Sequence, residues 1–296
     1  MPELPEVETI VRDLNKTVKG LKITDVWASW KKIIKQPNYN EFVKQIKNQK
    51  ILKTRRRAKY ILIDLSGNKT LIIHQKISGH LLYGKWEIKN KEVKSLANGP
   101  LKDDPQNRFI RFILYLNNGK QLGLSDLRRF AKILLVDTDE INEMKEIKEL
   151  GPEPLDSSFS FRKFREIFEK LVRRRGGGKI KQVLMDQNVI AGIGNIYSDE
   201  ILFEAKIHPL KEVQQLGDDD LKRIYQAMKK ILQRAIVLQG DSMSDYRTID
   251  GKKGRYQEVQ KVYQQEGEKC YRCKETIKRI KISGRSAHFC PVCQKL

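Results

Sequence analysis

The four cysteines of the chain form two CxxC pairs whose spacing fits a metal site. Cys270 and Cys273 make the first pair, and Cys290 and Cys293 make the second after sixteen intervening residues. Four thiolates at this spacing are typical of a closed, tetrahedral zinc site that serves structure. A redox-active pair is the alternative, but two CxxC units so close together argue against it. The sequence therefore predicts one structural Zn²⁺ per chain.

The stretch between the cysteine pairs, "KRIKISGRSAHF", predicts a short β-hairpin. Its two β-like runs meet at Ser283–Gly284, which places Arg285 near the tip. A module this small cannot bury a core of its own, so it needs the metal to fold. Because four sulfurs already fill the zinc shell, His288 is expected to pack in the hairpin and not to bind the metal.

A second stretch with chemical potential is "PELPEVET", which follows Met1 directly. One interpretation is an ordinary helix start, with proline in the first turn and acids facing the helix dipole. That accounts for Glu6 and Glu8, but not for the position of the segment at residue 2. If Met1 is removed, Pro2 carries a secondary α-amine, and α-amines titrate at about 7.7–8.0. The positive end of the following helix lowers that pKa further, so the amine can act as a nucleophile.

The composition points to a polyanionic partner. The 296 residues include 59 Lys and Arg against 37 Asp and Glu, a formal net charge of +22. Nucleic acid fits better than a membrane surface because the chain has no long apolar run or lipidation signal; a charge excess that only aids solubility is the alternative. The acidic start is unlike a signal peptide, so we expect a reducing, intracellular location without disulfides.

The elements that position these residues divide the chain into three parts. Residues 4–18 have helical spacing, whereas β-rich runs at 60–65, 69–74, 108–116 and 120–126 predict an antiparallel sandwich. The polar stretch 85–107 is expected to be a long loop. Beyond 149–160, four segments are helical by period: 161–172, 181–189, 195–205 and 219–239. We predict a β-rich domain at 1–150, a helical domain at 151–265 and a zinc module at 266–296.

Several blocks in one order resemble the formamidopyrimidine-DNA glycosylase family, the bacterial base-excision enzymes for oxidised purines. They are "PELPEVET", "RRRAKYILI", "LGPEPL", "DQNVIAGIGNIYSDEILFEAKIHP" and the CxxC pairs around "GRS". The resemblance runs over nearly the whole chain. It implies an α+β multidomain fold: an N-terminal antiparallel β-sandwich with flanking helices, a helical helix–two-turn–helix domain and a C-terminal zinc-finger hairpin.

The resemblance also implies the catalytic roles. Pro2 matches the nucleophile that attacks C1′ of the damaged nucleotide and forms a Schiff base, and Glu3 matches the acid–base residue that acts on the deoxyribose. Lys59, in "RRRAKY", matches a lysine that contacts the lesion-side phosphate and aids proton transfer. Arg285 matches the finger arginine that grips the flanking phosphates bidentately and assists the second elimination. Glu6 is given a supporting role at most.

Reaching a base inside a duplex requires flipping it out and filling the gap. The family fills it with a methionine, an arginine and a phenylalanine; here Ile77 in "HQKISG" takes the methionine's place, and "DLRRFA" supplies Arg128, Arg129 and Phe130. Isoleucine is a shorter, stiffer wedge. Arg128 is expected to face the orphaned base. For Phe130, packing in the core is the alternative.

Two further residues match DNA contacts of the family, and two segments depart from it. Asn195 ends the "AGIGN" turn ahead of a helix, where backbone N–H groups can meet a phosphate, and Lys181 lies in "KIKQ". A family histidine near 109–111 is replaced by "FIRF". The loop 239–257, which closes over oxidised guanine in the family, contains the divergent "GDSMSDY".

Together these observations predict a monomeric, zinc-containing bifunctional DNA glycosylase and abasic-site lyase, with excision followed by β,δ-elimination. Its expected partner is double-stranded DNA with oxidised bases or abasic sites, and its expected location is the bacterial cytoplasm, associated with the nucleoid. The oxidised-pyrimidine branch, often called endonuclease VIII, is a sibling alternative, although its N-terminus usually reads PEGPE. A catalytically silent DNA-binding protein would be indicated by loss of Pro2 or Glu3, and both are present.

Overall fold

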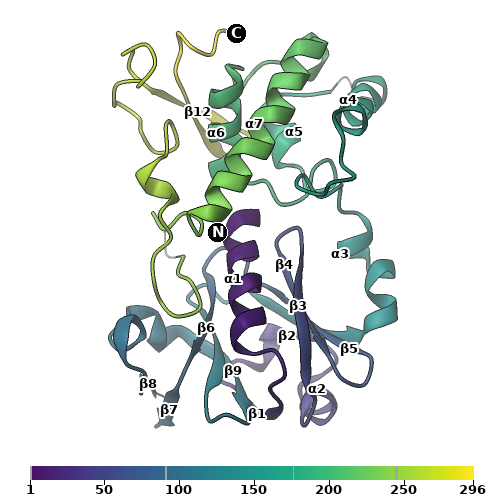
Figure 1. The fold of residues 1–296 in the computed structure, drawn as a ribbon, viewed down its shortest axis with the longest axis vertical. Helices are drawn as coiled ribbons and strands as arrows, with labels where there is room; N and C mark the ends of the chain where they lie inside the picture. The colour runs from purple at the N-terminus through teal and green to yellow at the C-terminus, as the bar shows by residue number, and fades with distance from the viewer. Residues whose placement is uncertain (1, 91, 176, 244–245) are drawn as a thin grey trace. The chain divides into compact units, whose positions relative to one another are not determined.

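The computed structural model describes residues 2–90, 92–175, 177–243 and 246–296 and divides into two compact units (Figure 1). The sandwich unit comprises Met1–Lys148 and Leu238–Arg255, and the helical unit comprises Glu149–Val237 and Tyr256–Leu296. The three domains expected from the sequence stay a prediction. Within the sandwich unit, the segment 238–255 adds Tyr246 and Ile249 to the hydrophobic core.

Two β-sheets form the sandwich. The four-stranded sheet has the order β1 (Ile23–Ala28), β9 (Ile110–Leu116), β10 (Gln121–Asp126) and β6 (Gly79–Gly84). The five-stranded sheet has the order β2 (Ile34–Gln36), β11 (Lys132–Asp137), β5 (Lys69–His74), β4 (Tyr60–Leu65) and β3 (Ile51–Arg57). The predicted sandwich is confirmed, and its pairs are antiparallel except for β2 with β11. The strand expected at 108–116 starts at Ile110 because 3₁₀ helix precedes it.

The core of the sandwich unit lies between the sheets and includes residues of α1 (Leu4–Thr17) and α2 (Tyr39–Ile46). The predicted helix at 4–18 is confirmed: Val7, Ile10 and Leu14 recur on one face and are fully buried. A short α3 (Lys145–Lys148) ends the first segment of the unit. Among the described residues, the 3₁₀ helices are η1 (Lys31–Ile33), η2 (Gly99–Leu101), η3 (Pro105–Phe109), η4 (Thr138–Glu143), η5 (Val213–Gln215) and η6 (Tyr256–Glu258).

The expectation of a long loop at 85–107 is wrong. The hairpin strands β7 (Trp86–Lys89) and β8 (Glu92–Ser95) lie there, and residue 91 between them is outside the described residues. Trp86 is buried, and its indole N–H donates to Asn107 Oδ1 at 2.8 Å. With Leu82 and Ile113 it forms a second cluster distinct from the main core. Each strand has only four residues, so the alternation of Trp86 and Ile88 with Glu87 and Lys89 is too short to be distinguished from a loop.

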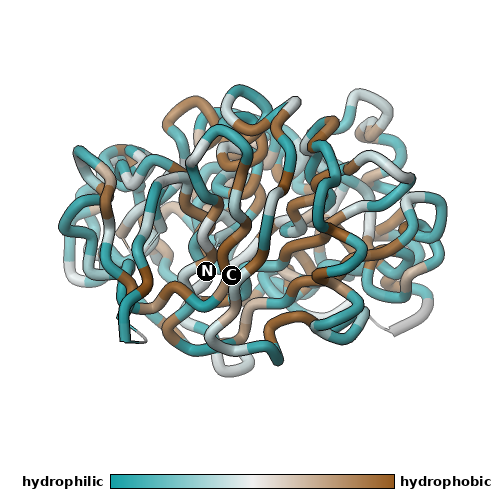
Figure 2. The backbone as a smooth tube through the Cα atoms, turned by 90° about the horizontal axis from the view of Figure 1, so that it is seen from below, coloured by the Kyte–Doolittle hydropathy of each residue, from teal (hydrophilic) through white to brown (hydrophobic). Residues whose placement is uncertain are grey.

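The helical unit contains α4 (Phe161–Arg175), α5 (Ile180–Met185), α6 (Asn195–Ala205), α7 (Asp218–Val237) and the hairpin of β12 (Lys278–Ile282) with β13 (Arg285–Phe289). The helices expected at 161–172, 195–205 and 219–239 are confirmed, whereas the one expected at 181–189 ends at Met185. Almost every side chain of α6 is buried, because α5, α7 and β13 all pack against this helix. None of the described helices is long and apolar enough to cross a bilayer. Figure 2 shows that hydrophilic residues predominate on the outer loops of the chain.

Candidate functional site

The start of α1 is fixed by a buried carboxylate. Glu3 is the N-cap residue, and its backbone N–H donates to Glu6 Oε2 at 2.7 Å. The other oxygen, Glu6 Oε1, accepts the backbone N–H of Asp241 at 2.9 Å. Pro2 and Glu3 are both buried. The predicted catalytic pair thus lies on a rigid helix end, while the removal of Met1 stays a prediction because that residue is outside the described ones.

The segment that contacts Glu6 requires a glycine. Gly240 has φ +82, and a Cβ at that position would lie 2.7 Å from Glu6 Oε1. A side chain here would therefore clash as well as strain the backbone. The segment belongs to the loop 239–257 that the sequence marked as divergent, of which residues 244–245 lie outside the described ones.

Asp241 is a candidate functional residue that the sequence reasoning missed. It is 2% exposed, and its Oδ1 accepts the backbone N–H of Met243 at 3.1 Å. Burial raises the pKa of this carboxyl to about 6, and the charge of Glu3 adds to the shift. Asp241 therefore gains or loses its proton close to neutrality next to the predicted catalytic acid. The departure "GDS" from the family pattern was the only sequence signal.

Lys59 lies in the tight turn between β3 and β4. Successive residues of β3 contact α1 at positions progressively closer to its N-terminus. Thr54 Oγ1 donates to Val11 O at 2.9 Å, and Arg56 Nε donates to Glu8 Oε2 at 2.9 Å. Because this series advances toward the N-terminal end of α1, the turn at Lys59 comes to the end that carries Glu3. The Lys59 side chain is mostly buried.

His74, which the sequence analysis did not single out, is a neutral neighbour of Lys59. Burial lowers the pKa of its imidazole to about 3, and the charges of Lys76 and Lys59 lower it further. Its Nδ1 accepts the backbone N–H of Lys76 at 3.0 Å, which leaves the proton on Nε2. The ring meets Tyr60 edge-on, with centroids 4.5 Å apart. The neutral imidazole therefore adds no positive charge beside Lys59.

The two loops that carry the exposed side chains of Ile77 and Phe130 are joined by hydrogen bonds. Ile77 is 40% exposed and Phe130 is 53% exposed, so Phe130 does not pack in the core. Ser78 Oγ donates to Asp126 Oδ1 at 2.6 Å, and the backbone N–H of Arg128 donates to Ser78 Oγ at 3.0 Å. These bonds join the loop after β5 to the loop after β10. The structure therefore brings together the residues predicted to fill the gap of a flipped base.

In the helical unit, a glutamine shapes the turn ahead of α6. Gln187 Oε1 accepts the backbone N–H of Gly192 at 2.9 Å, and Gln187 Nε2 donates to Ile193 O at 2.7 Å. Asn195 follows as the first residue of α6. Its buried Oδ1 has no hydrogen-bond partner among the described residues. Its predicted phosphate contact stays a prediction.

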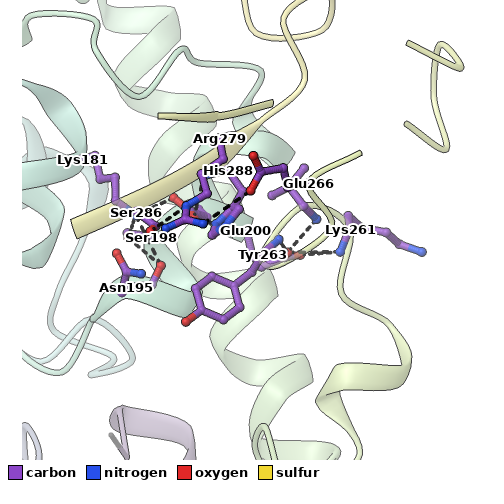
Figure 3. Close-up of polar contacts among 12 residues, drawn as sticks. Lys181, Asn195, Ser198, Glu200, Lys261, Tyr263, Glu266, Arg279, Ser286 and His288 are labelled. Atoms are coloured by element: carbon purple, nitrogen blue, oxygen red, sulfur yellow. Dashed lines mark hydrogen bonds and ion pairs between the residues drawn. The ribbon is translucent and has the colours of Figure 1, made fainter. Parts of the chain in front are cut away.

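Lys181 is enclosed inside the helical unit. Its side chain is 1% exposed; the ammonium pairs with Asp199 Oδ1 and donates to Ser198 Oγ at 3.2 Å (Figure 3). Asp199 Oδ2 accepts the backbone N–H of His288 at 2.9 Å and lies 2.9 Å from its ring Nδ1. The amine therefore joins α5, α6 and β13. Its predicted DNA contact stays a prediction, and what this geometry provides is support for the zinc hairpin.

Glu200, the next residue of α6, anchors the chain that leads to the zinc module. Its Oε1 accepts backbone N–H groups from Val262 at 2.9 Å and from Tyr263 at 3.0 Å, and its Oε2 accepts that of Lys261 at 3.0 Å (Figure 3). Burial raises the pKa of this carboxyl, against the lowering effect of the three N–H groups. One helix thus positions both the entry to the module and its hairpin.

The predicted zinc ligands converge. The sulfur atoms of the four cysteines all lie within 4.8 Å of one another, which suits four thiolates around one tetrahedral ion. This chain carries one structural zinc. As expected, His288 contacts Asp199 and is not part of the ligand cluster. Arg285 is exposed and follows the turn at Ser283–Gly284, whose Ser283 Oγ accepts from Gln182 Nε2 of α5.

Zinc removal should unfold the module without unfolding the sandwich. Cys270 and Cys290 are fully buried with Phe203 and Ile277, so losing the ion leaves this small cluster without its main restraint. Hydrogen exchange after treatment with a strong chelator should show lost protection across β12 and β13 and unchanged protection in the sandwich sheets. Metal analysis should find one zinc per chain. Full protection of the hairpin in a zinc-free protein would contradict this assignment.

Asp241→Asn should stabilise the protein at neutral pH. The folded-state pKa is raised, so the native state binds this proton more tightly than the unfolded chain does, and stability falls as pH rises from about 4 to about 6. Removing the charge should raise the free energy of unfolding at pH 7.5 by up to about 3 kcal/mol, with little change at pH 4. Urea unfolding at both pH values measures this.

Asp250→Asn in the same segment is the matched control for Asp241→Asn. Against the effect of burial, hydrogen bonds from Lys252 and Thr248 lower the pKa of Asp250. Its removal should therefore leave the neutral protein no more stable, and slightly less so. Equal stabilisation by both substitutions would show that net charge, and not the environment of Asp241, governs the effect.

Comparison with known proteins supports the same assignment along the whole chain. Residues 1–133 match the formamidopyrimidine-DNA glycosylase N-terminal domain, residues 150–247 match the H2TH domain of that family, and residues 267–296 match the zinc finger found in FPG and IleRS. Most of the sandwich, the α5–α6 region and the cysteine cluster described above lie within these three matches, and β11 extends beyond residue 133.

Curated relatives that match the full length of the chain are named formamidopyrimidine-DNA glycosylase. The chain is 42% identical over 296 residues to the formamidopyrimidine-DNA glycosylase of Pelotomaculum thermopropionicum, covering 100% of both chains. It is 37% identical to that of Listeria innocua, again with 100% of each covered. A Lactococcus lactis FPG mutant bound to Fapy-dG-containing DNA matches with a TM-score of 0.86, 34% identity and 100% of both chains. The chain therefore belongs to the formamidopyrimidine-DNA glycosylase family.

Proposed function

We propose that this protein excises oxidised purines from duplex DNA and then cleaves the strand at the resulting abasic site. Curated relatives of the same name span the whole chain, and Lactococcus lactis relatives have been crystallised with DNA that contains Fapy-dG or an abasic site. The +22 charge of the chain suits a DNA partner. We expect it to act as a monomer in the bacterial cytoplasm, close to the nucleoid.

The observation that carries the proposal is the rigid end of α1. Glu3 is held there by its own backbone bond to Glu6, and the hairpin turn with Lys59 lies at the same end. A nucleophile and an acid must be fixed within a fraction of an ångström to act together on one sugar. A buried helix start that holds Pro2 next to Glu3 meets that requirement.

The chemistry follows from these groups. The free amine of Pro2 bonds to C1′ as the bond from C1′ to the base breaks, and the base leaves with a proton. Glu3 protonates the deoxyribose as its ring opens, which leaves an iminium on Pro2. Loss of a proton from C2′ then expels the 3′ phosphate, and a second elimination expels the 5′ phosphate. Lys59 and Arg285 bind the phosphates that leave.

Base flipping is assigned to the two joined loops of the sandwich unit. The exposed side chains of Ile77 and Phe130 can enter the stack, and the guanidinium of Arg128 can bond the base left without a partner. Ser78 of one loop is hydrogen-bonded to Asp126 and Arg128 of the other, so we expect the two loops to act as one unit. Because these contacts exist before DNA binds, ordering the two loops adds little entropic cost to the energy of unstacking.

A pyrimidine substrate is the second candidate. One Lactococcus lactis structure, matching with a TM-score of 0.85 and 34% identity, holds DNA with an oxidised pyrimidine. Duplexes with oxidised pyrimidines therefore belong in the substrate tests. We expect them to be cut more slowly than formamidopyrimidine duplexes.

Borohydride should trap the enzyme on DNA through Pro2. Reduction of the iminium gives a stable adduct, and mass spectrometry should find the linked peptide beginning at Pro2, without Met1. Glu3→Gln should fold normally but lose most base excision, roughly 10²-fold or more, because the acid–base group is gone. Glu8→Gln, also acidic and on the same helix, should keep most activity.

Two results would contradict the catalytic assignment. One is a crosslink on a lysine such as Lys59. The other is normal excision by a form that retains Met1, in which the nitrogen of Pro2 is an amide and cannot attack. Either outcome would leave the DNA-binding proposal intact, because affinity for undamaged duplex is measured separately.

Salt should weaken DNA binding steeply. Each phosphate contact contributes a log–log slope of about −0.9, so Arg285→Ala should reduce the slope by about one unit. Arg162→Ala is the control: this arginine of α4 is 83% exposed and pairs with Glu166. It removes the same charge and should leave the slope unchanged. An affinity that does not depend on salt would refute the electrostatic role of the basic surface.

A further inference from the structure

The sandwich unit contains a cavity that none of the predicted catalytic residues lines. Its volume is about 420 Å³, and its walls are formed by Trp27, Ser29, Trp30, Ile88, Arg111 and Arg129. These residues come from β1, the segment that follows it, β7, β9 and the loop after β10. The volume is within the range of small-molecule sites. Pro2, Glu3 and Lys59 are not among its walls, so it is separate from the catalytic end of α1.

Two walls of the cavity are partly exposed indole rings, and Lys35 Nζ lies over the Trp30 ring, 5.5 Å from its centroid. Trp27 packs against the Trp86 cluster and Trp30 packs against the main core, so neither ring is free to turn away. Both are only partly buried, whereas Trp86 is 3% exposed and satisfied by its bond to Asn107. Fixed, accessible indoles are surfaces on which a planar ring can stack.

The other walls bring two positive charges together. Arg111 is partly buried, and its Nε is buried with no hydrogen-bond partner among the described residues. Burial lowers the pKa of Arg111, and the nearby guanidinium of Arg129 lowers it further, against the opposing effect of Asp126. Asp126 is itself engaged by Ser78. Arg111 and Arg129 line the same cavity, and such a pair of guanidiniums suits a phosphate, which can accept several N–H bonds at once.

We propose that this cavity binds a single nucleotide, with its base stacked on the indoles of Trp27 and Trp30 and its phosphate held by Arg111 and Arg129. Stacking on aromatic rings and guanidinium contacts to phosphate are the two interactions by which proteins hold unpaired nucleotides. The same chemistry is offered by a nucleotide of a DNA strand and by a free mononucleotide. Arg129 adjoins Arg128 and Phe130, which makes a strand nucleotide the source that we expect.

Two single-stranded probes test the aromatic half of the site. Fluorescently labelled pentathymidylate and a pentamer of abasic residues with the same charge are titrated into the zinc-loaded full chain by anisotropy. The base-bearing probe should bind about tenfold more tightly, the effect of one stacked base. Trp27→Leu and Trp30→Leu should abolish that difference, whereas Trp30→Phe should retain it because a ring remains.

Arg111→Gln tests the phosphate half independently. It should weaken pentathymidylate binding about tenfold. Lys120→Gln, the same charge change at an exposed position of the sandwich unit, should have little effect. This pair also keeps the proposal testable if a tryptophan variant fails to fold. Unlabelled thymidine monophosphate identifies the source: displacement at equal affinity indicates a free mononucleotide, and weaker displacement indicates a strand nucleotide.

Three outcomes would overturn the proposal. The two probes could bind wild-type protein equally. The difference could persist in both Trp→Leu variants. Finally, Phe130→Ala could abolish it while the tryptophan variants do not, which would place the stacked base on the exposed wedge and not in the cavity.

Discussion

The buried carboxylate of Glu6 is the interaction on which the catalytic end of the sandwich unit depends. An ionised group out of water is costly unless its oxygens accept hydrogen bonds. Glu6 is 1% exposed, and its two oxygens accept backbone N–H groups of Glu3 and Asp241, which are far apart in sequence. Gly240 is needed because any side chain there would meet the same carboxylate. The cost of burying one charge thus fixes the helix start and the loop beside it together.

In the helical unit, two buried carboxylates of α6 likewise accept hydrogen bonds from distant segments. Asp199 and Glu200 are almost completely buried, so water does not solvate either carboxylate. Lys181 and the backbone of His288 satisfy Asp199, and the backbone N–H groups at 261–263 satisfy Glu200. Removing one partner of such a network leaves an uncompensated charge, so the arrangement is highly specific. The position of Arg285 depends on α6 as well as on zinc, because the hairpin that carries it is hydrogen-bonded to Asp199 through His288.

Whether a basic side chain is exposed or buried determines its role in this protein. Arg128 and Arg129 are exposed on a loop whose geometry is set by Asp126, so their charge is available to a polyanion. Lys181 has the same formal charge, but the structure uses it inside the protein. A lysine in a basic motif cannot be assigned to DNA from its type alone, because burial decides whether its ammonium meets a phosphate or a carboxylate. Arg111 lies between these cases, partly buried and without a partner for its Nε among the described residues.

The sequence by itself determined the features that depend on local pattern: the amphipathic α1, the helices of the helical unit, the strands β4 and β5, and the four cysteines of the zinc site. Helical period, strand period and ligand spacing are properties of neighbouring residues and can be read directly. The resemblance supplied the roles of Pro2 and Glu3. Tertiary structure decided the rest: the β7–β8 hairpin, the parallel pairing of β2 with β11, the burial of Lys181 and the position of Asp241 beside Glu3. The last three join segments far apart in the chain, and such contacts leave no pattern in either segment. The β7–β8 hairpin is local, but its strands have only four residues each, and Trp86 is buried by Leu82 and Ile113 of other strands.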